Sequence, residues 1–233
     1  MIKSVTGIHN FIVLYFKKAG QFCCLLFLFS CQHSVNTSMI DKAVNGEKER
    51  VIRSLICIDS ALHLIKDGDV ITRTGMDYTS QALKQFCKKD DTYSHCGIIL
   101  KENDSFFVYH AIGGEINPKQ TLQREWLPWF CDGTSNEGIG IFRFNLNSVK
   151  LKREKKFIAE KYAAGILFDM DFNLKSDDKM YCSEFVAKTL MYAYQNNHLF
   201  DTTHIQQLDY FAVDNIYLNK NCREIHRFKY SSN

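Results

Sequence analysis

Residues 94–112 read SHCGIILKENDSFFVYHAI, and this stretch decides the fold class. Two runs rich in β-branched and aromatic residues, Ser94–Leu100 and Ser105–Ile112, flank the polar segment Lys101–Asp104. Such runs around a short polar loop predict an antiparallel hairpin. Helical patterns on both sides of this hairpin then predict an α+β domain with a small antiparallel sheet packed against helices, and not a doubly wound sheet.

The rest of the chain supplies the elements that surround the hairpin. Apolar residues at spacings of three and four predict an amphipathic helix from Glu47 to Ile65. The other expected elements are a strand at 70–73, a helix at 79–88, a short helix at 122–130, a strand at 139–144, helices at 148–164 and 181–194, and a strand at 224–228. No internal repeat and no second domain is visible in the sequence.

The length of the hairpin loop decides how His95 and His110 relate to each other. A four-residue loop at Lys101–Asp104 sets the two histidines directly opposite, on the same face of the sheet. A two-residue loop at Asn103-Asp104 makes them diagonal neighbours on one face, whereas a three-residue loop separates them onto opposite faces. With either even-length loop, one imidazole can hold the other in a defined tautomer and orientation.

Cys182 is the candidate nucleophile. It follows the polar turn Asp177–Met180 and opens the apolar pattern of the helix predicted at 181–194. Unpaired backbone N–H groups and the helix dipole favour a thiolate in a first helical turn. A thiolate also needs a neighbouring base, for which His95 is the candidate. The competing interpretation is that Cys182 is an ordinary buried core cysteine.

Five motifs in order along the chain resemble the YiiX/YebB-like branch of the NlpC superfamily, the circularly permuted papain-like cysteine hydrolases. They are Asp67–Ile71, Ser94–Ile98, Val108–Ala111, Phe168–Phe172 and Tyr181–Val186, within a resemblance that covers roughly residues 64–193. The resemblance implies a permuted papain-like fold and hydrolysis or transfer at an amide, typically in cell-wall peptides or related acyl substrates.

The same resemblance assigns expected roles to individual residues. Cys182 matches the nucleophile, His95 matches the base, and His110 falls where the family has its third polar residue. That third residue is often glutamate in this branch, so Glu115 competes with His110 as the group that orients His95.

Three functions remain open at this point. The first is an exported cysteine amidase or peptidase that works through an acyl-thioester on Cys182. The second is a thioester-based acyltransferase or lipid hydrolase, as in the related lecithin:retinol acyltransferase group. The third is a non-catalytic wall-binding module, against which the intact Cys182, His95 and His110 argue, because such a module needs no reactive thiol.

The N-terminal segment has the pattern of a secretory signal. Lys17 and Lys18 precede a short apolar run that ends at Ser30-Cys31, and this run is too short to cross a bilayer. Leu28-Phe29-Ser30-Cys31 resembles a lipobox, although an ordinary cysteine beside a signal is the alternative. We therefore expect a signal peptide at 1–30, a lipidated tether at 31–46 anchored through Cys31, and one hydrolase domain at 47–233 in the cell envelope, in the outer membrane or facing the periplasm.

Charge and cysteine spacing limit the partners. The formal charge of +3 falls to zero once Lys3, Lys17 and Lys18 are removed with the signal. A near-neutral domain argues against nucleic acid, which requires a basic surface. No CxxC or HExxH motif occurs, so no metal and no cofactor is expected. The expected partners are a peptide or acyl-amide substrate and, through the anchor, a membrane; the oligomeric state is not predicted.

Overall fold

The computed structural model describes residues 37–113, 117, 119–205 and 207–231, with side chains from residue 42 onward. The signal peptide at 1–30, the anchor at Cys31 and Glu115 lie outside these residues. Within the described part of the chain, no helix combines the length and apolar character that crossing a membrane requires. Contacts between residues group Met39–Asn233 into one compact unit, and the fold described below is the fold of this unit.

The hairpin forms through the shorter of the two even-length loops. Strands β2 (His95–Glu102) and β3 (Ser105–His110) pair Glu102 with Ser105, so that only Asn103 and Asp104 form the turn. Asn103 has a φ of 52°, a left-handed conformation that asparagine tolerates better than most residues. His95 and His110 are therefore diagonal neighbours on one face, and the four-residue loop that would set them directly opposite does not occur.

Gly97 allows the two strands to meet at the position between the histidines. The paired residues of β2 and β3 run as far as Ile98 and Tyr109, and one further step sets Gly97 opposite His110. A Cβ at Gly97 would lie 2.6 Å from Val108 Cγ1 and 2.8 Å from the Tyr109 carbonyl oxygen. Any other residue here would push β3, and with it His110, away from β2.

The hairpin belongs to a six-stranded antiparallel sheet with the strand order β4-β3-β2-β1-β5-β8. The other strands are β1 (Val70–Gly75), β4 (Gln123–Trp126), β5 (Asn136–Phe144) and β8 (Cys222–Lys229). A separate hairpin joins β6 (Thr203–Ile205) to β7 (Leu208–Tyr210). The predicted α+β class with a small antiparallel sheet is confirmed.

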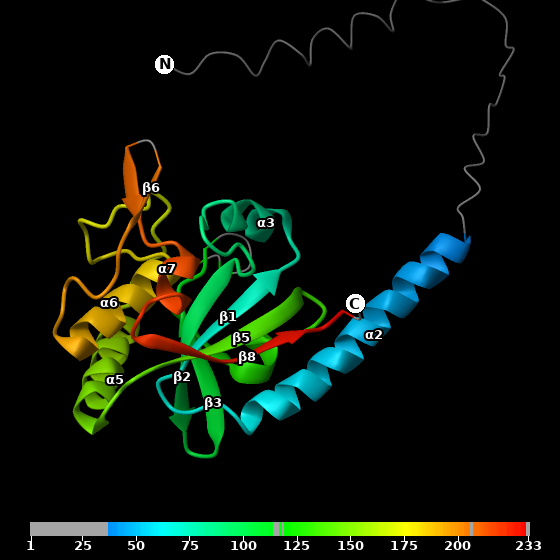
Figure 1. Cartoon of the computed structure of the whole chain (residues 1–233), viewed down its shortest axis with the longest axis horizontal. Coiled ribbons are helices and arrows are strands. Elements are labelled where there is room, and N and C mark those ends of the chain that lie inside the picture. Colours follow the sequence, from blue (N-terminus) through cyan, green and yellow to red (C-terminus); the bar gives the residue numbers. More distant parts are fainter. Residues whose placement is uncertain (1–36, 114–116, 118, 206, 232–233) are drawn as a thin grey trace, which may run out of the picture. The chain divides into compact units, whose positions relative to one another are not determined.

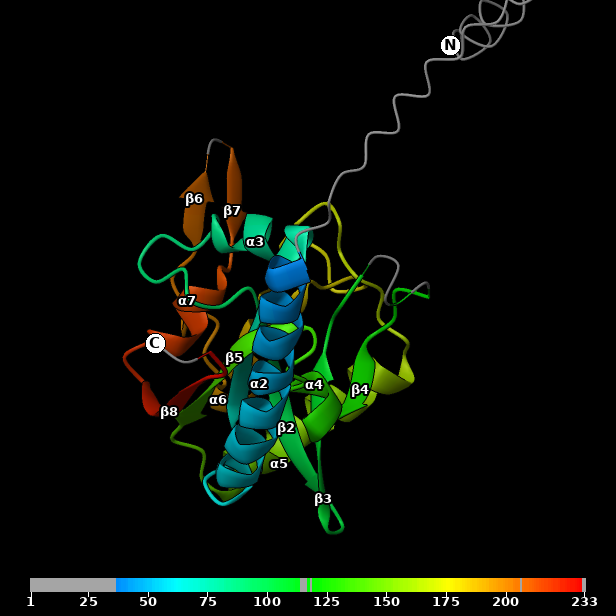
Figure 2. The same ribbon diagram turned by 90° about the vertical axis from the view of Figure 1, so that its right-hand side faces the viewer.

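Each face of the large sheet carries its own buried core, because side chains alternate along a strand. Ile98 and Phe142 face one core, together with Ile158 of helix α5 (Ser148–Ala163) and Phe185 of helix α6 (Cys182–Tyr194). Ile99 faces the other core, which contains Ile58 of helix α2 (Thr37–Leu62) and Phe130 of helix α4 (Leu127–Phe130). Figure 2 shows α2 in front of the sheet, with α5 and α6 behind it.

The helices occupy these two layers and one end of the sheet (Figure 1). Their bounds are α2 (Thr37–Leu62), α3 (Tyr78–Lys84), α4 (Leu127–Phe130), α5 (Ser148–Ala163), α6 (Cys182–Tyr194) and α7 (Val213–Tyr217). Helix α2 begins at Thr37, so part of the segment predicted as a tether is helical. The short helix α7 and the β6–β7 hairpin were not predicted from the sequence.

One sequence prediction is wrong in a way that affects the site. Residues 122–130 were expected to form a helix, but Gln123–Trp126 form strand β4, and only Leu127–Phe130 are helical. Strand β4 pairs with β3 at the edge of the sheet, with Val108 opposite Glu125. Its residues are polar or half-exposed, so their local pattern gives no strand signal, and pairing with a distant strand decides their conformation.

Candidate active site

Cys182 is the first residue of α6, and Tyr181 before it is extended. The Glu184 carboxylate accepts a hydrogen bond from the Tyr181 backbone N–H at 3.3 Å, which fixes the start of the helix. Phe185 and Val186 anchor the same turn in the core that α6 shares with β2. The Cys182 side chain thus has a rigid support, and the residue keeps 7% of its surface exposed.

His95 and His110 are in direct contact. The Nε2 atom of His95 lies 2.8 Å from the Nδ1 atom of His110, and the two rings meet edge to face. Both residues are buried, with His110 almost fully enclosed. His95 also lowers the pKa of the Cys182 thiol, which links the thiol electrostatically to this pair of imidazoles. The structure therefore brings all three residues singled out in the sequence, Cys182, His95 and His110, into one connected site.

A fourth residue, Glu125, continues this chain of contacts. Its Oε2 atom lies 3.1 Å from His110 Nε2 and 3.8 Å from an Nη atom of Arg73. Sequence analysis missed Glu125 because the predicted helix at 122–130 gave no reason to pair it with β3. No local signal identifies it, and Glu125 becomes a candidate only when β4 is recognised as the edge strand next to His110.

The electrostatics of the site keep His110 neutral and Glu125 ionised. Burial lowers the pKa of His110 to about 4, against the opposing effect of its hydrogen bond to Glu125. Burial alone would raise the pKa of Glu125, but the His110 hydrogen bond and the nearby Arg73 charge leave it below its usual value. Glu125 is therefore an acceptor for His110 at neutral pH.

Phe130 encloses the two imidazoles on the side of α4. Its ring lies 5.8 Å from that of His95 and 5.1 Å from that of His110, measured between ring centroids. The Arg73 guanidinium lies over the same ring at 4.4 Å and donates a hydrogen bond to the Phe130 carbonyl at 3.1 Å. Phe130 and Arg73 thus fix the side of the site that α4 forms.

The Cys182 thiol is strongly activated. Its pKa is held well below the usual value, first by a hydrogen bond from the Cys96 side chain and then, against the effect of burial, by His95. The backbone amide of Cys96 contributes a further hydrogen bond. These interactions favour the thiolate of Cys182, the form in which cysteine is nucleophilic.

An apolar hollow opens beside Cys182. It is small, with a volume of about 40 Å³, and its described lining contains no acidic or basic side chain. Aromatic residues dominate this lining: Phe86, Phe168, Phe172, Tyr181, Tyr210 and Phe211. Tyr181 and Ser183 fix one wall, because the Tyr181 hydroxyl accepts from the Phe211 N–H and the Ser183 hydroxyl donates to the Phe211 carbonyl, both at 2.7 Å.

No group of three or more His, Cys, Asp and Glu side chains in the described part of the chain is arranged to hold a metal ion. The six cysteines in that part, Cys57, Cys87, Cys96, Cys131, Cys182 and Cys222, are all free thiols.

Comparison with known proteins agrees with this geometry. The profile of the Peptidase_C92 family, the permuted papain-like amidase enzymes of the YaeF/YiiX type, matches residues 64–220. The uncharacterized protein YiiX of Escherichia coli strain K12 is 26% identical over 148 residues, which cover 63% of this chain and 65% of that protein. The match thus spans slightly less than two thirds of this relative's length.

A solved structure shares the fold. The crystal structure of the protein titled metalloprotein yiiX, from Escherichia coli O157:H7, matches with a TM-score of 0.58 and 17% sequence identity. The match covers 71% of this chain and 99% of that one. The family profile spans most of the chain, including His95, His110, Glu125 and Cys182, and so confirms the resemblance seen in the sequence. The protein described here belongs to the Peptidase_C92 family of permuted papain-like amidases.

Proposed function

We propose that this protein is a cysteine amidase in which Cys182 attacks the amide carbonyl and His95 acts as general base and acid. The observation that carries the proposal is the chain of contacts from His95 through His110 to Glu125, together with the lowering of the Cys182 thiol pKa by His95. A nucleophile, a base and a group that orients the base are the parts that acyl transfer through a thiol requires.

The proton positions follow from the acceptor at the end of this chain. Ionised Glu125 only accepts, so His110 donates from its Nε2 atom. The Nδ1 atom of neutral His110 then accepts from the Nε2–H group of His95. This leaves the Nδ1 atom of His95 as the one that exchanges a proton with the thiol. His110 and Glu125 together thus orient His95 and select its tautomer.

The reaction uses these groups in order. The Cys182 thiolate adds to the carbonyl carbon, and the oxyanion that forms faces backbone N–H groups of the first turn of α6, which lack intrahelical acceptors. His95 gives its proton to the leaving amine, and an acyl-thioester remains on Cys182. His95 then takes a proton from water, which attacks the thioester and releases the acid.

The hollow beside Cys182 supports a substrate with an apolar group on the acyl side of the scissile bond. A lining of aromatic rings without charges favours an acyl-amide over a charged cell-wall peptide. The same lining favours the second function, a lipid hydrolase or acyltransferase that shares the thioester step. We rank it second because the amidase family supports attack on an amide.

The test is hydrolysis by the purified protein of three substrates: an N-acyl amine with a medium-length or aromatic acyl group, a cell-wall peptide and a phospholipid. The matched control is Cys182→Ala. Cleavage of the N-acyl amine, with an acyl adduct on Cys182 detected by mass spectrometry, supports the proposal. Cleavage of the phospholipid alone would support the second function, and equal cleavage by Cys182→Ala would exclude a thiol mechanism.

We further propose that the enzyme is an exported lipoprotein that is anchored through Cys31. The signal pattern at residues 17–31 supports this location. In cells, we expect Cys31→Ala to move the protein from the membrane fraction to the soluble fraction. An unchanged distribution between the two fractions would argue that Cys31 is not an anchor.

Glu125 provides a sharper prediction for the site. Replacement by alanine removes the acceptor for His110, so the tautomer of His95 is no longer fixed and the partly buried Arg73 loses an ionic partner. We expect kcat to fall by about 10- to 100-fold, with a smaller change in KM, by analogy with other orienting groups. Glu125→Gln retains an oxygen acceptor and should recover part of the loss. Equal and unchanged kcat values in both variants would exclude this positioning role.

A further inference from the structure

Arg73 lies on the same face of the sheet as the two histidines and closes their chain of contacts. In the pairing of β1 with β2 it stands directly opposite His95, so both side chains point to one face. The neighbouring strands β3 and β4 add His110 and Glu125 to this face. Although β2 and β3 separate β1 from β4, the Nη1 atom of Arg73 lies 3.8 Å from Oε2 of Glu125. The residues at the two ends of this row therefore meet.

The Arg73 guanidinium is held in a defined place. Its side chain is only 15% exposed, and the guanidinium lies 4.4 Å from the centre of the Phe130 ring. The Nη1 atom that faces Glu125 also donates to the Phe130 carbonyl at 3.1 Å. Since an arginine keeps its charge over the whole working range of pH, a permanent positive charge stands beside the oxygen that accepts from His110.

We propose that Arg73 is a positioning residue that sets the direction of the hydrogen-bond chain from His95 to Glu125. Its charge keeps an additional proton out of the Glu125–His110 pair, so that His110 presents an acceptor to His95. The consequence for catalysis rests on the proposed function. The protonation of the pair is a property of the folded protein and is measured without a substrate.

One proton taken up by this pair reverses the chain. If it binds His110, it occupies Nδ1, which then donates to Nε2 of His95 and no longer accepts from it. If it binds Glu125, the carboxyl donates to Nε2 of His110, and the ring proton of His110 moves to Nδ1 with the same result. In both cases the proton of His95 moves to its Nδ1 atom, which then cannot accept a proton from the thiol or from water. His95 is no longer a base.

The local charges act in the required direction. Burial lowers the pKa of His110 to about 4, and the Arg73 charge acts in the same sense. Burial raises the pKa of Glu125, but its hydrogen bond to His110 and the Arg73 charge bring it below its usual value. Further titratable groups that act on these three residues come from β2, from α6 and from the segments after β1 and α4: His95, Cys182, Asp77 and Cys131. Burial raises the pKa of the Cys131 thiol, which therefore stays neutral.

Three variants separate the charge of Arg73 from its packing. Arg73→Met removes the charge and keeps an unbranched stem, whereas Arg73→Lys keeps the charge. In the methionine variant the Phe130 carbonyl still accepts from Asn136 Nδ2 at 3.3 Å, so α4 retains a bond at its end. Arg124→Met is the matched control, because Arg124 precedes Glu125 in β4, faces the other side of the sheet and is also ion-paired. Circular dichroism verifies folding of each variant.

The measurement is long-range ¹H–¹⁵N NMR of the full-length protein labelled at its histidine rings, recorded as the pH is lowered. It reports which ring nitrogen of His95 and of His110 carries a proton. In the wild type at neutral pH we expect the proton on Nε2 of both rings. In Arg73→Met, proton uptake by the Glu125–His110 pair should occur at a pH higher by about one pH unit, the effect of a lost opposite charge at this distance. Arg73→Lys should restore most of the wild-type titration, and Arg124→Met should titrate as the wild type does.

Hydrolysis of the N-acyl amine separates this inference from the proposed function. Where the amide is cleaved, the acidic side of the pH profile of kcat should move in Arg73→Met together with the NMR titration, with little change in KM. A shifted titration in a protein that cleaves no amide would contradict the amidase proposal and support the role of Arg73. Cleavage with an unshifted titration in Arg73→Met, or an equal shift in Arg124→Met, would overturn the role of Arg73.

Discussion

Replacing His95 with alanine is expected to lower the rate of acyl-thioester formation at Cys182 by about 10²- to 10⁴-fold, the usual contribution of a general base. The variant loses the group that exchanges a proton with the thiol, and it also loses one of the interactions that lower the thiol pKa. Single-turnover kinetics with an N-acyl amine, followed by mass spectrometry of the Cys182 adduct, measures this rate.

The pH dependence of alkylation tests the same assignment without a substrate. Only the thiolate reacts with iodoacetamide, so the rate rises as pH passes upward through the thiol pKa. In the wild type this rise should occur well below the ordinary cysteine value of about 8.5, because Cys96 and His95 stabilise the thiolate. In His95→Ala the rise should move to higher pH, while the hydrogen bond from Cys96 keeps part of the shift.

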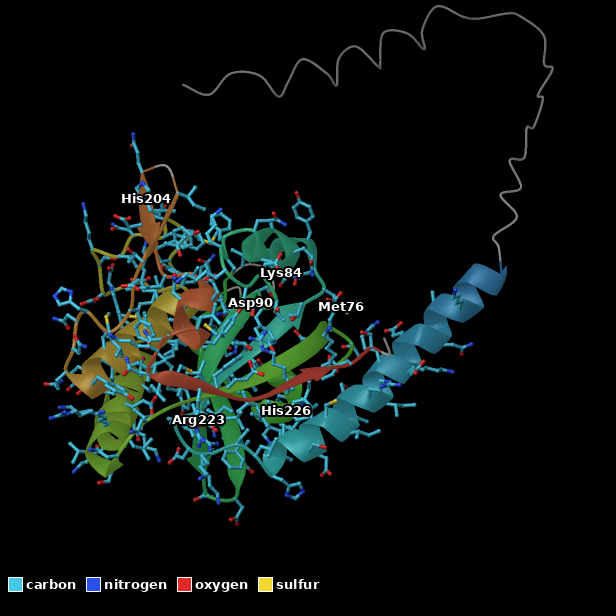
Figure 3. The ribbon with its side chains drawn as sticks, viewed as in Figure 1. Met76, Lys84, Asp90, His204, Arg223 and His226 are labelled. Carbon is cyan, nitrogen blue, oxygen red and sulfur yellow. The ribbon has the colours of Figure 1, made fainter. Side chains whose placement is uncertain are left out.

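His204→Ala is the matched control for both measurements. This histidine is exposed on the β6–β7 hairpin, where it pairs with Asp209 at 2.9 Å, and Figure 3 labels it on β6. Its replacement should leave the thioester rate and the alkylation profile unchanged. A His95→Ala variant that forms the thioester at the wild-type rate would remove His95 from the mechanism.

Replacing Asp214 with alanine is expected to lower the free energy of unfolding by about 3–5 kcal/mol. Asp214 lies in α7 with 1% of its surface exposed. Its Oδ2 atom accepts from the backbone N–H groups of Lys88 at 3.0 Å, Lys89 at 2.8 Å and Asp90 at 3.4 Å. Removing the carboxylate leaves these donors without their acceptor. Urea denaturation of the purified protein measures the loss.

Loss of the Asp214 carboxylate should also disturb the site. The turn at Lys88–Asp90, which this carboxylate holds, connects Cys87 of the hollow to the strand that begins at His95. Asp90, labelled in Figure 3, is held a second time by Arg227 at 2.8 Å. Asp214→Asn retains an oxygen acceptor and should lose only about 1–2 kcal/mol. Asp201→Ala, on the surface, should stay within about 0.5 kcal/mol of the wild type. Wild-type stability in Asp214→Ala would show that the turn does not depend on this carboxylate.

Local sequence patterns were sufficient to predict most of the helices and strands of the fold. The alternation in residues 94–112 predicts the hairpin, and the apolar spacing after Cys182 predicts a helix that begins within one residue of its observed start. Both patterns reflect burial of one side of an element, which neighbouring residues encode directly. Where the pattern is weak, as at Gln123–Trp126, the prediction fails, because pairing with β3 decides the conformation there.

For the site, the sequence predicts which residue types take part and which face of their strand or helix they occupy. By itself, the sequence determined that His95 and His110 share a face for any even-length loop, and that Cys182 opens a helix, since strand and helix periods fix these relations locally. Only the tertiary structure decided that the turn is Asn103-Asp104, that Glu125 meets His110, and that Cys182 lies in the core shared by β2 and α6. These last relations join segments distant along the chain, and the packing of the strands and of α6, rather than any local preference, selects them.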